Sequence, residues 1–275
     1  MIVAAATVPG APLLLPGVTG GPVQEAEKAR EAMAAAVTVL LDHDAEEIVV
    51  LGAAPTTRPF PLHTPGPESR LAPTSGLEGR LTPGPGSRVA PSSGVGGRLA
   101  PDSASRVAPT SGPESGVAPA PGGRAAGEVP GDILPVSLAV GRSLLEGCPV
   151  PWTLRGVARD ASADACRELG RELAAGGRPT GLLVVADGSA RRGEKAPGHV
   201  DPRAIELDAR IGAALAAADA GALLRLDAAA CERALAAGRA AWQVMAAACE
   251  DRPWRSRVLY EEDPFGVAYW VVTWS

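Results

Sequence analysis

The chain has 275 residues, of which 46% are hydrophobic, and a formal net charge of −5. This length and apolar content suffice for one large domain or two small ones. The acidic balance and the absence of a basic cluster exclude the electrostatic pattern of a nucleic-acid-binding protein. Prolines and glycine interrupt the first apolar run and no later run is long enough for a membrane span, so we expect a cytoplasmic protein without a membrane partner.

The N-terminal part of the sequence alternates strand and helix patterns. Residues 2–8 form a short apolar run typical of a strand, and residues 23–41 carry apolar side chains at helical spacing. A second apolar run at residues 48–51 predicts the next strand.

A segment of different composition follows. More than half of residues 64–123 are Pro, Gly or Ser, and related Arg-Leu/Val-Ala-Pro segments begin at Arg70, Arg88 and Arg106. Such a segment buries too little apolar surface to offset the entropy lost on ordering. We therefore predict a disordered, repeat-rich insert at about residues 64–129.

The pattern of a folded domain resumes after the insert. Residues 133–136 and 152–158 are expected to be extended, and residues 138–145 to be helical. Ser162 is placed to cap the next helix, because a serine side chain accepts a hydrogen bond from a backbone N–H of the first turn.

Residues 182–186 form a wholly apolar run, which is typical of a strand buried on both faces and predicts the centre of a sheet. Two helices follow at about residues 202–218 and 228–249, the second bent near Gly238. The chain closes with a hairpin.

Strands that alternate with helices predict an α/β domain, and the terminal hairpin, residues 257–260 and 267–274, adds antiparallel strands. We expect a single domain over residues 1–275, a three-layer sandwich with a mostly parallel or mixed central sheet and helices on both faces.

Loops that leave the carboxyl ends of strands build the site in such a sheet. Four of them are candidates: residues 9–12, 52–63, 187–201 and 261–264. The third is the richest in polar and charged groups and follows the most buried strand.

Three acidic residues of these loops, Asp187, Asp201 and Glu261, are candidate metal ligands, since carboxylates bind divalent cations. His199 could join them or transfer a proton. The alternative is structural, with Asp187 capping a turn and Asp201 capping the following helix.

The same loop offers basic groups. Arg191, Arg192 and Lys195 could receive an anionic substrate, or they could be solvated at the surface. We take His199, Arg191 and Lys195 as candidate catalytic residues. The candidates for substrate binding are Gly10, Ser189 and Arg192. Ser137 and Ser189 lie outside any Gly-x-Ser-x-Gly elbow, so a hydrolase triad is not supported.

Several segments together resemble a known family. They are Val-Pro-Gly-Ala-Pro-Leu-Leu-Leu-Pro-Gly-Val from residue 8, Val-Val-Ala-Asp-Gly-Ser-Ala-Arg-Arg-Gly-Glu-Lys from residue 184 and Pro-Phe-Gly-Val-Ala-Tyr-Trp-Val from residue 264. They resemble the B-type subunits of the class III extradiol ring-cleavage dioxygenase superfamily, in particular an uncharacterised actinobacterial branch, over nearly all of the chain outside the insert.

The resemblance implies a non-haem Fe(II) held by two histidines and a glutamate, with a further histidine as acid and base and a catecholate as substrate. This sequence departs from that pattern. Gly10 stands where the first iron-binding histidine is expected, residues 52–55 offer none at the second position, and Arg191 or Arg192 ends the segment of the acid–base histidine.

Two function classes remain. The first is a family member that has lost the iron-binding histidines and has no expected cofactor, either a binding or accessory protein or an enzyme with a site relocated to residues 187–201. The alternative is a ring-cleavage dioxygenase with Fe(II) or another divalent metal held by His63, His199 and Glu261 or Glu262. A purely structural partner would lack a small-molecule pocket. The resemblance also implies a possible homodimer.

Overall fold

The computed structural model describes residues 1–15, 18, 23–60, 134–194 and 196–275. The insert predicted at about residues 64–129, His63 and Lys195 lie outside the described residues. None of the described helices is both long enough and apolar enough to cross a membrane.

The described part of the chain forms a seven-stranded mixed sheet in the order β3-β4-β2-β5-β1-β7-β6. Neighbours among β4, β2, β5 and β1 run parallel, whereas β3, β7 and β6 each pair antiparallel. The strands are β1 (Ile2–Val8), β2 (Glu47–Ala54), β3 (Arg58–Pro59), β4 (Trp152–Ala158), β5 (Thr180–Val185), β6 (Ser256–Glu262) and β7 (Tyr269–Trp274). The predicted α/β fold with a mixed central sheet is confirmed.

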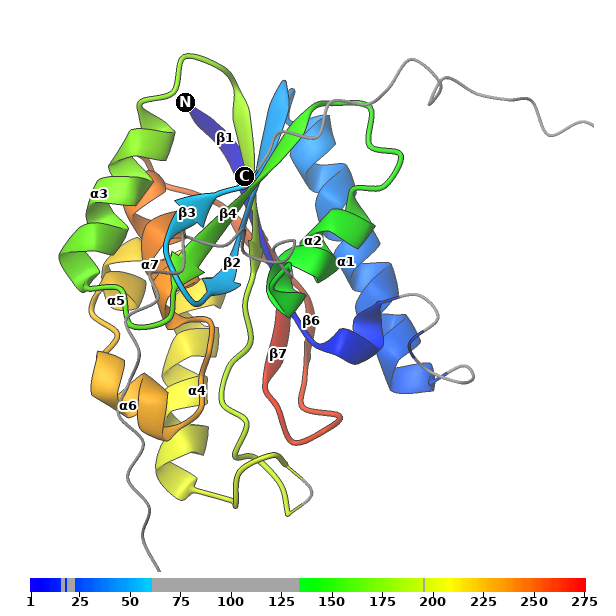
Figure 1. Ribbon diagram of the computed structural model, residues 1–275, viewed down its shortest axis with the longest axis vertical. Coiled ribbons are helices and arrows are strands. Elements are labelled where there is room, and N and C mark those ends of the chain that lie inside the picture. Colours follow the sequence, from blue (N-terminus) through cyan, green and yellow to red (C-terminus); the bar gives the residue numbers. More distant parts are fainter. Residues whose placement is uncertain (16–17, 19–22, 61–133, 195) are drawn as a thin grey trace, which may run out of the picture. The chain divides into compact units, whose positions relative to one another are not determined.

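Helices cover both faces of this sheet (Figure 1). One face carries a short 3₁₀ helix, η1 (Pro12–Leu14), with α1 (Gln24–Asp42) and α2 (Val136–Leu144). The other face carries α3 (Ala163–Ala174), α4 (Pro202–Ala216), α5 (Ala220–Leu224), α6 (Ala228–Arg233) and α7 (Arg239–Ala248). These layers make the predicted three-layer sandwich.

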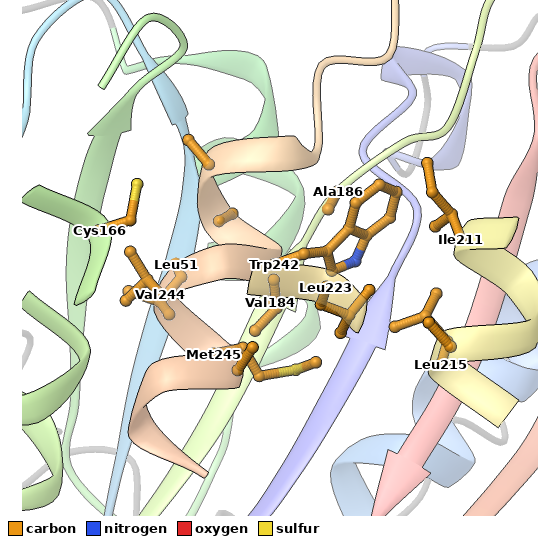
Figure 2. Packing of buried hydrophobic residues seen from close by; sticks show 14 of the residues in the cluster. Leu51, Cys166, Val184, Ala186, Ile211, Leu215, Leu223, Trp242, Val244 and Met245 are labelled. Atoms are coloured by element: carbon orange, nitrogen blue, oxygen red, sulfur yellow. The ribbon is translucent and has the colours of Figure 1, made fainter. Parts of the chain in front are cut away.

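Each face has its own core, because successive side chains of a strand point to opposite faces. In β5, Leu182 and Val184 pack under α7, whereas Leu183 and Val185 pack under α1 and α2. Figure 2 shows the first core, where the Trp242 ring lies among aliphatic side chains from α4, α5 and the sheet. The Trp242 indole Nε1 donates to Thr7 Oγ1 over 2.8 Å, so the one polar atom of this buried ring is satisfied.

Two predicted elements need correction. Val136, predicted as the end of an extended segment at residues 133–136, is the first residue of α2. Pro135 precedes it, and proline is compatible with a helix start because the N–H it lacks would have no helical partner. Residue 133 lies outside the described residues.

The helix predicted at residues 228–249 is two helices, α6 and α7. The chain turns between them, with Leu235 at φ +56° and Gly238 close to the sheet. A Cβ on Gly238 would lie 2.8 Å from Ala186 Cβ, so the close approach of this turn to Ala186 requires glycine. The sequence pattern also missed β3, η1 and α5.

Candidate functional site

A hollow of about 750 Å³, here named the carboxyl-edge hollow, lies at the carboxyl ends of β1, β2 and β5. The helices that follow β1 and β2 cover one face of the sheet, and those that follow β5 cover the other. The chain therefore leaves β5 toward one face of the sheet and leaves its neighbours β1 and β2 toward the other face. Such a switch point leaves a crevice between the loops. Its lining includes Gly10, Ala53, Ala54, Pro55, Ser137 and Asp187. The hollow thus brings together residues of three of the four candidate loops, those after the first, second and central strands.

Asp187 lines this hollow. It follows Ala186, the first residue after the end of β5. Its Oδ1 accepts the Gly10 N–H over 2.8 Å, and its backbone carbonyl accepts the Gly238 N–H over 3.0 Å. Burial raises the pKa of the Asp187 carboxyl from 3.8 to about 6, against the opposing effects of the Gly10 hydrogen bond and the positive charge of Arg159. The side chain keeps some accessible surface because it borders the hollow. Its Oδ2 has no hydrogen-bond donor among the described residues.

The N-terminus of α2 forms another wall. The N–H groups of Val136, Ser137 and Leu138 precede the first helical hydrogen bond, which Ala139 makes to Pro135. Ser137 Oγ donates to the Ala53 carbonyl over 2.9 Å, which ties this turn to the end of β2. The free N–H groups of a helix N-terminus favour a negatively charged or oxygen-rich ligand group.

The loop after β4 supplies charged groups, Arg159 and Asp160, at the same edge. Buried Arg239 holds this loop, since its Nη2 donates to the carbonyls of Arg159 and Ala161 over 2.6 and 2.9 Å. Neither arginine is among the residues that the sequence pattern indicates as site candidates. Arg159 follows a predicted strand, a position that could have revealed it, whereas Arg239 sits in a helical pattern without any distinguishing signal.

The described residues that line the carboxyl-edge hollow do not fit a ferrous ion. Gly10 and residues 52–55, at the positions where the resemblance implies the iron-binding histidines, bring no side-chain donor atom. Across the parts of the chain that the structure describes, no three His, Cys, Asp or Glu side chains are grouped so that they could hold a metal ion. His199 is exposed and does not line this hollow.

Other predicted site residues lie around a second hollow of about 610 Å³, here named the β6–β7 hollow. Buried Asp208 accepts hydrogen bonds from the Ser189 N–H and hydroxyl and, over 3.2 Å, from Arg192 Nη1. Arg192 Nε also donates to Asp263 Oδ2 over 2.7 Å. Glu261 accepts the indole N–H of Trp270 over 3.1 Å. Ser189 and Arg192, candidates for substrate binding, thus belong to a network that is already hydrogen-bonded within the protein.

The remaining candidates are dispersed. Asp201 caps α4 by accepting the Arg203 N–H over 3.0 Å, which is the structural role that the sequence left open. Arg191 is partly buried, and its Nε has no acceptor within the described ranges. The structure therefore does not bring Asp187, Asp201 and Glu261 together as one ligand set.

Comparisons with known proteins add little. No family model matches the sequence. No curated protein matches it either. Among solved structures, the chain is similar to the crystal structure of uncharacterized protein JW3007 from Escherichia coli K12, with 14% identity, a TM-score of 0.46 and coverage of 98% of this chain and 99% of that chain. A likeness of this degree carries no argument about function.

Proposed function

We propose that the protein is an extradiol-dioxygenase-like family member without the iron-binding histidines, and that it binds a small polar molecule in the carboxyl-edge hollow. The cytoplasm is its proposed location, and a small molecule rather than a nucleic acid is its proposed partner. The Asp187 carboxyl acts there as hydrogen-bond partner and as proton donor or acceptor.

The proposal rests on Asp187, which lines the carboxyl-edge hollow, has a raised pKa and keeps one carboxyl oxygen without a partner among the described residues. A carboxyl whose pKa is raised to about 6 exchanges its proton near neutral pH, which suits a general acid or base. The carboxyl lines a hollow at the switch point of the sheet, where ligands of open α/β sheets bind. Its Oδ2 has no other hydrogen-bond partner among the residues described.

The surroundings of Asp187 suit a ligand hydroxyl. The Asp187 carboxylate would accept the hydroxyl proton, and the electron pair would stay on the ligand oxygen. The N-terminus of α2 and the positive charge of Arg159 favour that oxyanion. In a protein that only binds its ligand, the same contacts provide hydrogen bonds without a reaction.

A thermal-shift screen tests the proposal, because a ligand that binds only the folded state raises Tm. The screen uses the full chain at pH 7 with catechols, phosphorylated metabolites and divalent metals. We expect Tm to rise with a hydroxylated organic molecule in metal-free buffer, and Asp187→Asn to abolish that rise.

The matched control is Asp164→Asn, whose carboxyl is exposed in the first turn of α3. This variant should respond as the wild type does. The proposal is wrong if Asp187→Asn keeps the full response, or if only metals raise Tm.

A further inference from the structure

A third hollow, of about 500 Å³, adjoins the carboxyl-edge hollow. It lies between α6 and the loop that follows β4, and is here named the α6 hollow. Arg159, Asp160 and Ala237 line both hollows. A ligand that occupies the carboxyl-edge hollow can therefore extend past Arg159 into the α6 hollow.

The α6 hollow combines small apolar walls with two guanidinium groups. Its apolar lining comes mainly from alanines and Leu235, so it suits a short hydrocarbon body. Arg159 and Arg239 supply the positive charge. Arg159 is exposed, whereas Arg239 is only 4% exposed.

Arg239 carries a buried charge without a counter-ion among the described residues. Its hydrogen-bond acceptors are neutral oxygens: Gln243 Oε1 at 2.8 Å and the carbonyls of Arg159 and Ala161. A buried charge is unfavourable unless an opposite charge accompanies it, so an anion beside this guanidinium would be stabilised.

Two acidic residues, Asp160 and Glu232, also line the α6 hollow, but both are exposed. Neither forms an ion pair with Arg159 or Arg239 within the described ranges. Their negative charges nonetheless matter for the choice of anion, because they repel a doubly charged phosphate more than a singly charged carboxylate. The planar guanidinium also matches the geometry of a carboxylate.

We propose that the α6 hollow binds the carboxylate of a small organic acid through Arg159 and Arg239, with the hydrocarbon body against the alanines and Leu235. The inference rests on the proposed function, because the rest of the same ligand lies beside Asp187. It adds a substrate class, organic acids, to that site.

Hexanoate and hexan-1-ol are the probes, since they share a hydrocarbon body and differ in charge. Both are titrated into the ¹⁵N-labelled full chain at pH 7.5, and the Nε–Hε signals of the arginines are followed by NMR. We expect hexanoate to shift the signals of Arg159 and Arg239 and hexan-1-ol to leave them in place.

Arg159→Gln tests the site and keeps the hydrogen bond that holds the loop after β4, because Arg239 donates to the backbone carbonyl of residue 159 and not to its side chain. We expect hexanoate to bind about fivefold more weakly to this variant. Arg257→Gln, which removes an exposed arginine of β6, is the matched control and should bind as the wild type does. Equal binding of the two probes, or unchanged binding to Arg159→Gln, would overturn the proposal.

Asp187→Asn separates this inference from the proposed function. Hexanoate should bind this variant as it binds the wild type, because the fragment needs only the α6 hollow. If hexanoate binds as expected while Asp187→Asn does not alter the response in the thermal-shift screen, the proposed role of Asp187 fails and the carboxylate site stands.

Discussion

The carboxyl-edge hollow and the β6–β7 hollow are similar in size and are both lined by charged residues, yet their charged groups differ in their partners. Around the β6–β7 hollow, Asp208 binds Ser189 and Arg192, and Arg192 also binds Asp263. In the carboxyl-edge hollow, Asp187 has a single side-chain hydrogen bond among the described residues, from Gly10.

This difference separates structural charges from candidate functional ones. A polar group whose bonds are all made within the protein stabilises the fold, whereas a buried group that retains bonding capacity is available to a ligand. The loop after β5 contributes to both, with Asp187 in one hollow and Arg192 in the other.

The largest expected effect is at the buried network. Asp208→Ala removes the acceptor of Ser189 and Arg192 and should lower the free energy of unfolding by about 3 kcal/mol. Urea denaturation measures this value. A loss below about 1 kcal/mol would show that the β6–β7 network is not structural and would remove the contrast between the two hollows.

A substitution at Asp187 is expected to increase the free energy of unfolding, whereas Asp208→Ala lowers it. Its raised pKa means that the folded state holds the proton more tightly than the unfolded state, so stability falls as pH rises from about 4 to about 6 and then stays constant. Asp187→Asn removes that penalty and can still accept the Gly10 N–H. It should increase the free energy of unfolding by at most about 3 kcal/mol at pH 7.5.

The same variant at pH 4 is its own control. There the wild-type carboxyl is almost fully protonated in the folded state and about half protonated in the unfolded state, so the gain should fall below about 1 kcal/mol. Urea denaturation at both pH values provides the comparison, and an equal gain at pH 4 and pH 7.5 would contradict the assigned cause.

A substitution at the contact between α2 and β2 tests how closely this helix packs on the sheet. A Cβ on Gly141 would lie 2.4 Å from Val50 Cγ1, so Gly141→Ala should displace α2 and destabilise the protein by about 2 kcal/mol. Gly177→Ala is the control, because nothing described lies within 4 Å of its added Cβ. Thermal unfolding should separate the two variants, and equal Tm values would show that α2 is not closely packed against β2.

The smallest effect is expected at the rim of the β6–β7 hollow. The Asp263 side chain is 47% exposed, and water can replace it as the partner of Arg192. Asp263→Ala should therefore cost less than about 1 kcal/mol in urea denaturation. A loss as large as that of Asp208→Ala would show that the contribution of these two carboxylates to stability does not depend on their exposure.

Much of the fold follows from the sequence pattern. The pattern predicts the strands at residues 2–8 and 152–158 with their observed bounds, because each is a short run that fits a mostly buried strand. It predicts the break between α6 and α7 only as a bend near Gly238. The close approach of that glycine to Ala186 could not be predicted, because the two residues are distant in sequence.

The candidate site could be predicted in part. The rule that loops at carboxyl strand ends converge places Gly10, residues 53–55 and Asp187 together. It does not distinguish Asp187 from Arg192 in the same loop, because that distinction depends on Asp208 of α4. Nor does it reveal Arg239, whose importance comes from burial and from its contact with the loop after β4.

The central claim is that the Asp187 carboxyl is held in the carboxyl-edge hollow with a proton affinity near neutral pH. The most direct test is a ¹³C NMR titration of the aspartate carboxyl signals, with Asp187→Asn used to assign the signal of Asp187. The account predicts a titration midpoint at about 6. A midpoint at or below about 4, the value of a solvated aspartate, would contradict it.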